Sequence, residues 1–113
     1  MIITRTPFRI SFAGGGSDLK DFYEKYGGCV LSTSINRYCY ISIHPYFDEN
    51  RTLLKYSENE LVDSLSDIRH RIFNCLLNER QIHGVEIVST ADIPGGTGLG
   101  SSSAFTVGLL NTL

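Results

Sequence analysis

The sequence predicts an α+β fold with a mixed β-sheet and helices. Two observations support this prediction. Some segments alternate apolar and polar side chains with a period of two, whereas others repeat apolar side chains at helical spacing. In chain order these segments are strand, helix, strands, helix, strand, glycine-rich loop and helix. The 113 residues are 42% hydrophobic and 19% charged, which suits one globular domain.

The N-terminal third contains two predicted strands around a short helix. Residues 2–12 alternate as a half-buried strand does, with a break at Pro7. A helix follows the triple glycine, and we expect Ser17 or Asp18 to cap its start. Its stripe is made of four large apolar side chains: Leu19, Phe22, Tyr23 and Tyr26. Residues 29–44 alternate again and predict the second strand.

The middle of the chain predicts a strand and then a long helix. Residues 52–56 are expected to pair with the preceding strand. Ser57 and Glu60 have the spacing of a capping box, which predicts that a helix begins there. The stripe behind them consists of Leu61, Leu65, Ile68, Ile72 and Leu76.

The C-terminal part predicts a strand at residues 85–90 and a helix at residues 101–113. That helix carries no glycine cap, basic last turn or proline at its end. We therefore expect the helix and the protein to continue beyond Leu113. Truncation there should expose four apolar side chains, namely Val107, Leu109, Leu110 and Leu113.

Composition argues against several classes of protein. The net charge of -2 gives no sign of a surface for nucleic acid or anionic lipid. No segment reaches the roughly 20 apolar residues of a transmembrane helix, and no secretory signal is evident. Cys29, Cys39 and Cys75 are interpreted as reduced core or strand residues. These features favour a cytoplasmic protein without a nucleic-acid or membrane partner, and they leave its oligomeric state open.

The segment between the last strand and the last helix suits a nucleotide triphosphate. Glycines let backbone amides approach an anion, and a helix start offers unpaired N–H groups. Serine hydroxyls can reach phosphate or Mg²⁺. The candidate phosphate-binding residues are Gly95, Gly96, Thr97, Gly98, Leu99, Gly100, Ser101, Ser102 and Ser103.

Two familiar phosphate loops do not match this segment. A Walker A loop needs a lysine before its Ser or Thr, and residues 57–113 contain no lysine. The dinucleotide fingerprint needs glycine where this chain has Ser101. A glycine-rich turn that only caps a helix is the structural alternative.

The segment resembles the motif Pro-x-x-x-Gly-Leu-Gly-Ser-Ser-Ala of the galactokinase, homoserine kinase, mevalonate kinase and phosphomevalonate kinase (GHMP) family. Pro94 and residues 98–102 match it, whereas Ser103 replaces an alanine found in many members. The resemblance implies an N-terminal ATP-binding domain over residues 1–113. It also implies ATP and Mg²⁺ as cofactors, with Ser102 as the first candidate and Ser101 as the second for holding the metal.

Residues 5–18 resemble the first motif of the same family, which contributes to the acceptor site. The residues of this motif look most like those in kinases of D-glycero-D-manno-heptose 7-phosphate. Asp18 can accept hydrogen bonds from sugar hydroxyls; the alternative is that it serves only as a helix cap. Arg9 can contact an anionic group, or it can be a solvated strand residue. The candidate substrate-binding residues are Arg9, Gly14, Gly15, Gly16, Ser17 and Asp18.

The resemblance implies transfer of the ATP γ-phosphate to the anomeric hydroxyl of a sugar phosphate. The family's catalytic aspartate is expected beyond Leu113, so the chain alone is expected to be inactive. The alternatives are another sugar kinase such as a fucokinase, and a non-catalytic nucleotide or sugar sensor. A nucleic-acid-binding module is a further alternative, because the family fold resembles a domain of a ribosomal protein. The two glycine loops are expected to open toward one shared cleft.

Overall fold

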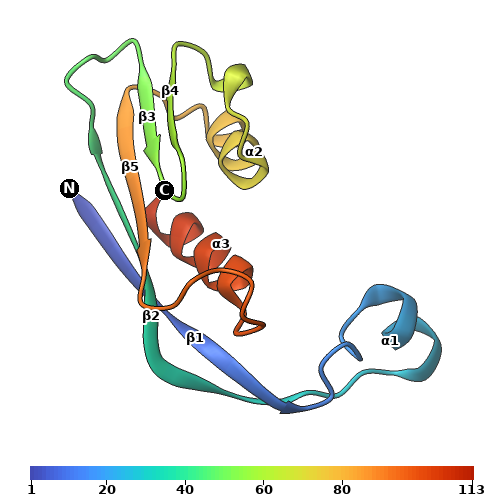
Figure 1. The fold of residues 1–113 in the computed structure, drawn as a ribbon. Helices are drawn as coiled ribbons and strands as arrows, with labels where there is room; N and C mark the ends of the chain where they lie inside the picture. The colour runs from blue at the N-terminus through green and yellow to red at the C-terminus, as the bar shows by residue number, and fades with distance from the viewer.

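Five strands form one mixed sheet in a computed structural model that describes residues 1–113 (Figure 1). The spatial order is β1-β2-β5-β3-β4, and only the pairing of β3 with β5 is parallel. The strands are β1 (Ile2–Ala13), β2 (Leu31–Pro45), β3 (Thr52–Lys55), β4 (Asn59–Val62) and β5 (Val85–Ala91). The predicted α+β class with a mixed sheet is confirmed.

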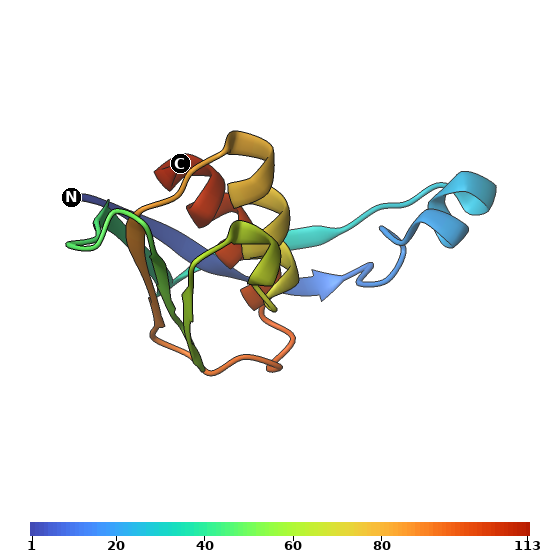
Figure 2. The same ribbon diagram turned by 90° about the horizontal axis from the view of Figure 1, so that it is seen from above.

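Helices α2 (Arg71–Arg80) and α3 (Ser101–Thr112) cover one face of the sheet (Figures 1 and 2). Apolar side chains from both layers meet between them and make the core. Its fully buried members are Phe8, Ile41, Leu54, Phe73, Leu77, Ile87 and Leu109. On the uncovered face, Arg5 stacks over the ring of Tyr38 at 4.4 Å.

Gly108 allows α3 to lie close to the first two strands. A Cβ atom at this position would come within 2.9 Å of Thr6 Oγ1 and 3.3 Å of Ile41 Cδ1. At the same contact, Thr4 Oγ1 donates a 3.0 Å hydrogen bond to the carbonyl oxygen of Gly108. The second half of α3 is therefore held against the sheet, which orients the helix that follows the predicted phosphate loop.

The strands β1 and β2 extend beyond the core as a two-stranded ribbon that carries α1 (Lys20–Tyr26) at its far end (Figures 1 and 2). The helix forms where the apolar stripe predicts it, but none of its residues is buried. No residue between Phe8 and Cys39 is buried. The ribbon and its helix are thus a separate, solvent-exposed part of the fold.

The long helix predicted from residue 57 onward is wrong in its first half. Residues 59–62 form β4, a short 3₁₀ helix spans Leu65–Asp67, and the α-helix begins only at Arg71. Glu60 does not act in a capping box; its strand pairs with β3 instead. Cross-strand pairing competes successfully with helix propensity here, because the hairpin packs beside β5.

Three smaller expectations also need correction. Leu19 occupies the N-cap position of α1 without a side-chain cap, so neither Ser17 nor Asp18 caps that helix. Cys39 is buried in β2, but Cys29 lies exposed in a loop and Cys75 lies exposed on α2. Of the apolar side chains expected to be exposed on α3, Val107 and Leu110 are exposed, whereas Leu109 is fully buried.

None of the helices is long and apolar enough to cross a membrane.

Candidate functional site

The loop between β5 and α3 has the backbone of an open anion cradle. Gly96, Gly98 and Gly100 have φ values of 80°, 74° and 74°, the left-handed region that favours glycine. A Cβ at Gly96 or Gly98 would have no heavy atom within 4 Å. These three glycines are therefore needed for the path of the loop, and the space beside Gly96 and Gly98 stays open for a ligand.

Three serines begin α3 directly after this loop. No side-chain hydrogen bond within the chain uses the hydroxyls of Ser101, Ser102 or Ser103; Ser102 contributes only its carbonyl, which accepts from Thr106. The N–H groups of a first helical turn lack helical partners, and the positive end of the helix dipole lies there. Free hydroxyls and free amides at one helix end suit a phosphate chain.

A hollow of about 260 Å³ adjoins these serines. Its lining includes serine hydroxyls beside the phosphate loop and three aromatic rings from separate segments; the lining residues are Tyr56, Ser57, His70, Ile72, Ser89, Ser101, Ser102 and Phe105. The His70 ring packs 4.8 Å from the Tyr56 ring and 5.3 Å from the Phe105 ring, measured between centroids. The hollow thus combines a hydroxyl-rich end with an aromatic wall.

A buried carboxylate holds that wall from behind. The Glu60 side chain is only 2% exposed. One of its oxygens accepts a 2.6 Å hydrogen bond from the Tyr56 hydroxyl and a 3.2 Å bond from the His70 N–H. The other accepts from the Arg69 N–H at 2.7 Å. Burial raises the pKa of Glu60, but these hydrogen bonds outweigh it and leave the pKa lowered.

Glu60 also affects the ionisation of its phenol partner. The hydrogen bond to Glu60, aided by burial, raises the pKa of Tyr56 to about 12. The Tyr56 phenol therefore stays protonated at neutral pH and remains a hydrogen-bond donor to the carboxylate.

Arg9 lies beside the second glycine loop rather than beside the first. Its N–H donates a 3.1 Å hydrogen bond to the carbonyl of Leu99, and its side chain covers Gly100, where a Cβ would meet Arg9 Cγ at 3.1 Å. Its guanidinium donates to Ser11 Oγ at 2.7 Å. Arg9 and Ser103 both line a hollow of about 340 Å³ on this side of α3. Arg9 therefore connects the ribbon strand to the phosphate loop.

The first glycine loop lies at the far end of the ribbon and is closed by hydrogen bonds of its own. Ser17 Oγ lies 2.7 Å from the Gly14 carbonyl oxygen and 2.9 Å from the Cys29 carbonyl oxygen, so its one hydrogen is shared between them, and it accepts from the Cys29 N–H. A Cβ on Gly14 would lie 1.8 Å from the Cys29 carbonyl oxygen. Asp18 Oδ1 accepts from the Gly16 N–H at 3.1 Å, and the Asp18 side chain is otherwise exposed.

The structure does not bring the two glycine loops together. At about 3.3 Å per residue, Gly14 lies roughly 16 Å along the strand from Arg9. No hollow of this chain is lined by both loops. Their shared cleft therefore stays a prediction.

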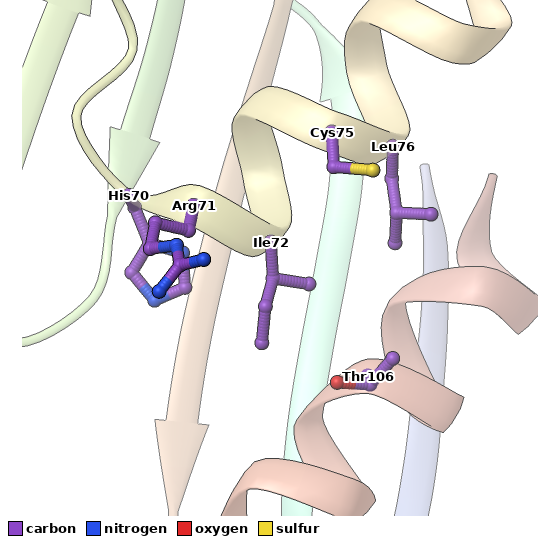
Figure 3. A pocket seen from close by; sticks show the side chains of 6 residues that line it. All are labelled: His70, Arg71, Ile72, Cys75, Leu76 and Thr106. Carbon is purple, nitrogen blue, oxygen red and sulfur yellow. The ribbon is translucent and has the colours of Figure 1, made fainter.

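A larger hollow, of about 730 Å³, separates α2 from α3 (Figure 3). Ile72 and Leu76 extend from α2 toward the side of α3 that carries Thr106. Size alone would favour it as the site, but it contains no residue of either glycine loop and only one permanent charge, Arg71. We place the candidate site at the smaller hollow because free hydroxyls and loop amides are found there.

No sequence motif indicates the aromatic wall. Glu60, expected in a capping box, lies next to it, and His70 belongs to no motif that predicts a ligand. The useful signal was the Lys55-Tyr56-Ser57 segment, which resembles the heptose kinase subgroup. It gave no indication that the Tyr56 ring packs on His70, or that His70 packs on Phe105, because those contacts join three separate segments of the chain.

Comparisons with known proteins support the family resemblance seen in the sequence. Residues 67–113 match the family model described as the GHMP kinases N terminal domain. The chain is 29% identical to the D-glycero-alpha-D-manno-heptose 7-phosphate kinase of Campylobacter jejuni, over 96% of this chain and 36% of that protein.

Solved structures show the same fold. A D-glycero-D-manno-heptose 1-phosphate kinase from Bacteroides thetaiotaomicron superposes with a TM-score of 0.84 at 26% identity, covering 99% of this chain and 40% of that one. The mevalonate kinase of Methanococcus jannaschii gives a TM-score of 0.72 at 22% identity, covering 98% and 38%. The chain thus spans about two fifths of the length of these relatives. It has the fold of a GHMP kinase N-terminal domain, and the family resemblance seen in its sequence is confirmed.

Proposed function

We propose that residues 1–113 are the N-terminal ATP-binding domain of a sugar kinase. The observation that carries this proposal is the open glycine loop followed by three free serine hydroxyls at the start of α3. The four glycines of the loop and the helix end offer amides to phosphate, while the serines offer hydroxyls. Gly95, Gly96, Thr97, Gly98, Leu99 and Gly100 form the loop part of this site, and Ser101, Ser102 and Ser103 form the helix part.

The neighbouring hollow supports the proposal that a nucleotide binds here, with its nucleoside beside the phosphate cradle. Its serine end adjoins the phosphate cradle, and its aromatic wall of Tyr56, His70 and Phe105 offers flat apolar surface to a nucleoside. A phosphate chain on the loop would leave its nucleoside directed into this hollow.

Mg²⁺ fits the donor set of this site in part. Ser102 is our candidate ligand, because its hydroxyl is exposed and has no partner in the chain. Mg²⁺ prefers oxygen ligands and commonly takes most of them from substrate phosphates and water. When bound, the ion would neutralise charge that develops on the transferred phosphoryl group. No carboxylate lines the hollow, so the remaining ligands come from the nucleotide, from water or from elsewhere in the protein.

For the acceptor we propose D-glycero-D-manno-heptose 7-phosphate, phosphorylated on its anomeric hydroxyl. The acceptor oxygen would form a bond to the γ-phosphorus and give up its proton to a base, while the bond from that phosphorus to the β–γ bridging oxygen breaks, releasing ADP. Support comes from the first glycine motif and from the heptose kinase relatives. Asp18, with its second carboxylate oxygen free, and the exposed Gly15 and Gly16 are the candidate sugar contacts.

The test measures kcat/KM of the full-length protein with four acceptors. Heptose 7-phosphate should exceed fucose and galactose by orders of magnitude, since a hydrogen-bonding site rejects analogues strongly. Heptose 1-phosphate has no free anomeric hydroxyl and should give no product. Preference for an unphosphorylated hexose would overturn the heptose assignment, and turnover of heptose 1-phosphate would overturn the anomeric position. No nucleotide-dependent turnover with any sugar would overturn the kinase assignment.

A further inference from the structure

We propose that Glu60, which does not line the nucleotide hollow, positions the aromatic wall that recognises the nucleoside. This inference rests on the proposed nucleotide site and adds a residue to it. Glu60 lies behind Tyr56 and His70, on the edge strand β4. Its role would be to select how the donor nucleotide binds, not to touch the phosphates.

The first step of the argument is that every oxygen of this carboxylate is engaged. Burying an ionised carboxylate is costly unless hydrogen bonds compensate it. Here three donors from two separate segments converge on Glu60: the Tyr56 hydroxyl and the N–H groups of Arg69 and His70. The Arg69 guanidinium adds an ion pair, with Nε 3.7 Å from a Glu60 oxygen.

The second step is that these donors belong to the pieces that make the wall. Tyr56 ends the β3 side of the hairpin, and its N–H donates to the Glu58 carbonyl across the turn. His70 is the N-cap residue of α2 and stands at its first turn (Figure 3). Because one carboxylate binds both, it fixes the hairpin turn relative to the start of the helix.

The third step links this clamp to the phosphate end. The His70 ring contacts Phe105, which lies one turn into the helix that begins at Ser101. A shift of His70 would change the width of the hollow but would leave the loop at residues 95–100 in place, since that loop is held by Arg9. Loss of Glu60 should therefore affect nucleoside recognition and spare phosphate recognition.

The experiment compares two probes on the full-length protein by calorimetry: Mg²⁺-ADP and inorganic tripolyphosphate with Mg²⁺. Glu60→Gln keeps the size of the side chain but places an amide where Arg69 or His70 donates. We expect the Kd for ADP to rise about tenfold, because rings that are no longer held in place must be ordered when the nucleoside binds. The Kd for tripolyphosphate should stay within about twofold.

Two further variants keep the test decisive. Tyr56→Phe retains the ring and removes one hydrogen-bond donor to Glu60. It should therefore also raise the Kd for ADP, by a smaller factor than Glu60→Gln. Glu58→Gln is the matched control, because Glu58 also pairs with Arg69, at 3.2 Å, but is 60% exposed and outside the hollow. It should leave both Kd values unchanged.

The outcomes separate this inference from the proposed function. If Glu60→Gln and Tyr56→Phe raise the Kd of both probes equally, or raise neither, Glu60 does not position the nucleoside wall and the inference fails. If the unmodified protein binds tripolyphosphate but not ADP, the hollow is not a nucleoside site and the inference fails with it. If the unmodified protein binds neither probe, the proposed kinase function itself is overturned.

Discussion

The body of the domain and the ribbon that carries α1 differ in how far their side chains are buried. In the body, side chains from five strands and two helices bury one another, and all 15 buried residues belong to it. In the ribbon, the same kinds of side chains form the predicted elements but stay exposed, with Tyr26 at 75%. The two candidate ligand motifs are divided between them.

Local sequence signals can therefore specify a helix without specifying a surface against which it packs. A seven-residue helix is marginal alone, because nucleation costs more than a few hydrogen bonds return. Around α1, Ser17 and the tight approach of Gly14 to Cys29 supply the missing constraint. Around α3, packing on β1 and β2 supplies it.

The largest contrast should appear when a phenylalanine is truncated in each region. Phe73 is fully buried between α2 and the sheet, so Phe73→Ala should lower the free energy of unfolding by about 3–5 kcal/mol. Phe22 on α1 is 44% exposed, so Phe22→Ala should cost less than about 1 kcal/mol. Urea unfolding of the full-length protein measures both. Equal losses would show that the ribbon is buried in solution.

The next contrast lies within the ribbon and uses two adjacent glycines. Gly14→Ala places a Cβ on the Cys29 carbonyl at a φ of 79°, and should open the α1 loop at a cost of at least about 3 kcal/mol. Gly15→Ala meets no heavy atom within 4 Å and should be neutral. Limited proteolysis between residues 14 and 29 reports the opening. Equal protection of both variants would mean that the loop is not held by this contact.

A smaller effect should follow pH in the body. The pKa of Glu60 in the folded protein lies below its ordinary value. Ionised Glu60 therefore contributes fully to the free energy of unfolding above about pH 4.3, and this contribution is lost as the pH falls through the folded pKa. Glu60→Gln should therefore be less stable than the unmodified protein by roughly 1–3 kcal/mol at pH 7, and this difference should shrink in acid. Denaturant titrations at pH 7 and below pH 4 measure it. A difference that grows in acid would contradict the assignment.

Sequence alone predicted the elements whose signal is local. The alternation in β1 and β2, the stripe of α1 and the glycine–serine run before α3 each specify their own backbone. The boundary between β4 and α2 escaped prediction, because Glu60 and Leu61 satisfy a helical pattern equally well. Pairing with β3 decides that segment, and such pairing depends on residues far along the chain.

In the candidate site, too, contiguous residues could be predicted from the sequence, whereas residues that the fold brings together could not. The phosphate loop could be predicted because its residues are contiguous. The wall of Tyr56, His70 and Phe105 could not, since each ring reaches the hollow from a different element. Arg9 was assigned to the acceptor motif, and only the fold shows it against Leu99 and Gly100.

The central claim is that the body binds the donor nucleotide while the tip of the ribbon contacts the acceptor. Steady-state kinetics of the full-length protein with Ser102→Ala and Asp18→Asn tests it most directly. Ser102→Ala should raise KM for Mg²⁺-ATP by about tenfold or more, as expected for a lost bond to a charged group, and leave KM for the sugar phosphate unchanged. Asp18→Asn should raise KM for the sugar phosphate and leave that for ATP unchanged. If each substitution raises both values alike, or if the two effects are exchanged, the division between body and ribbon is wrong.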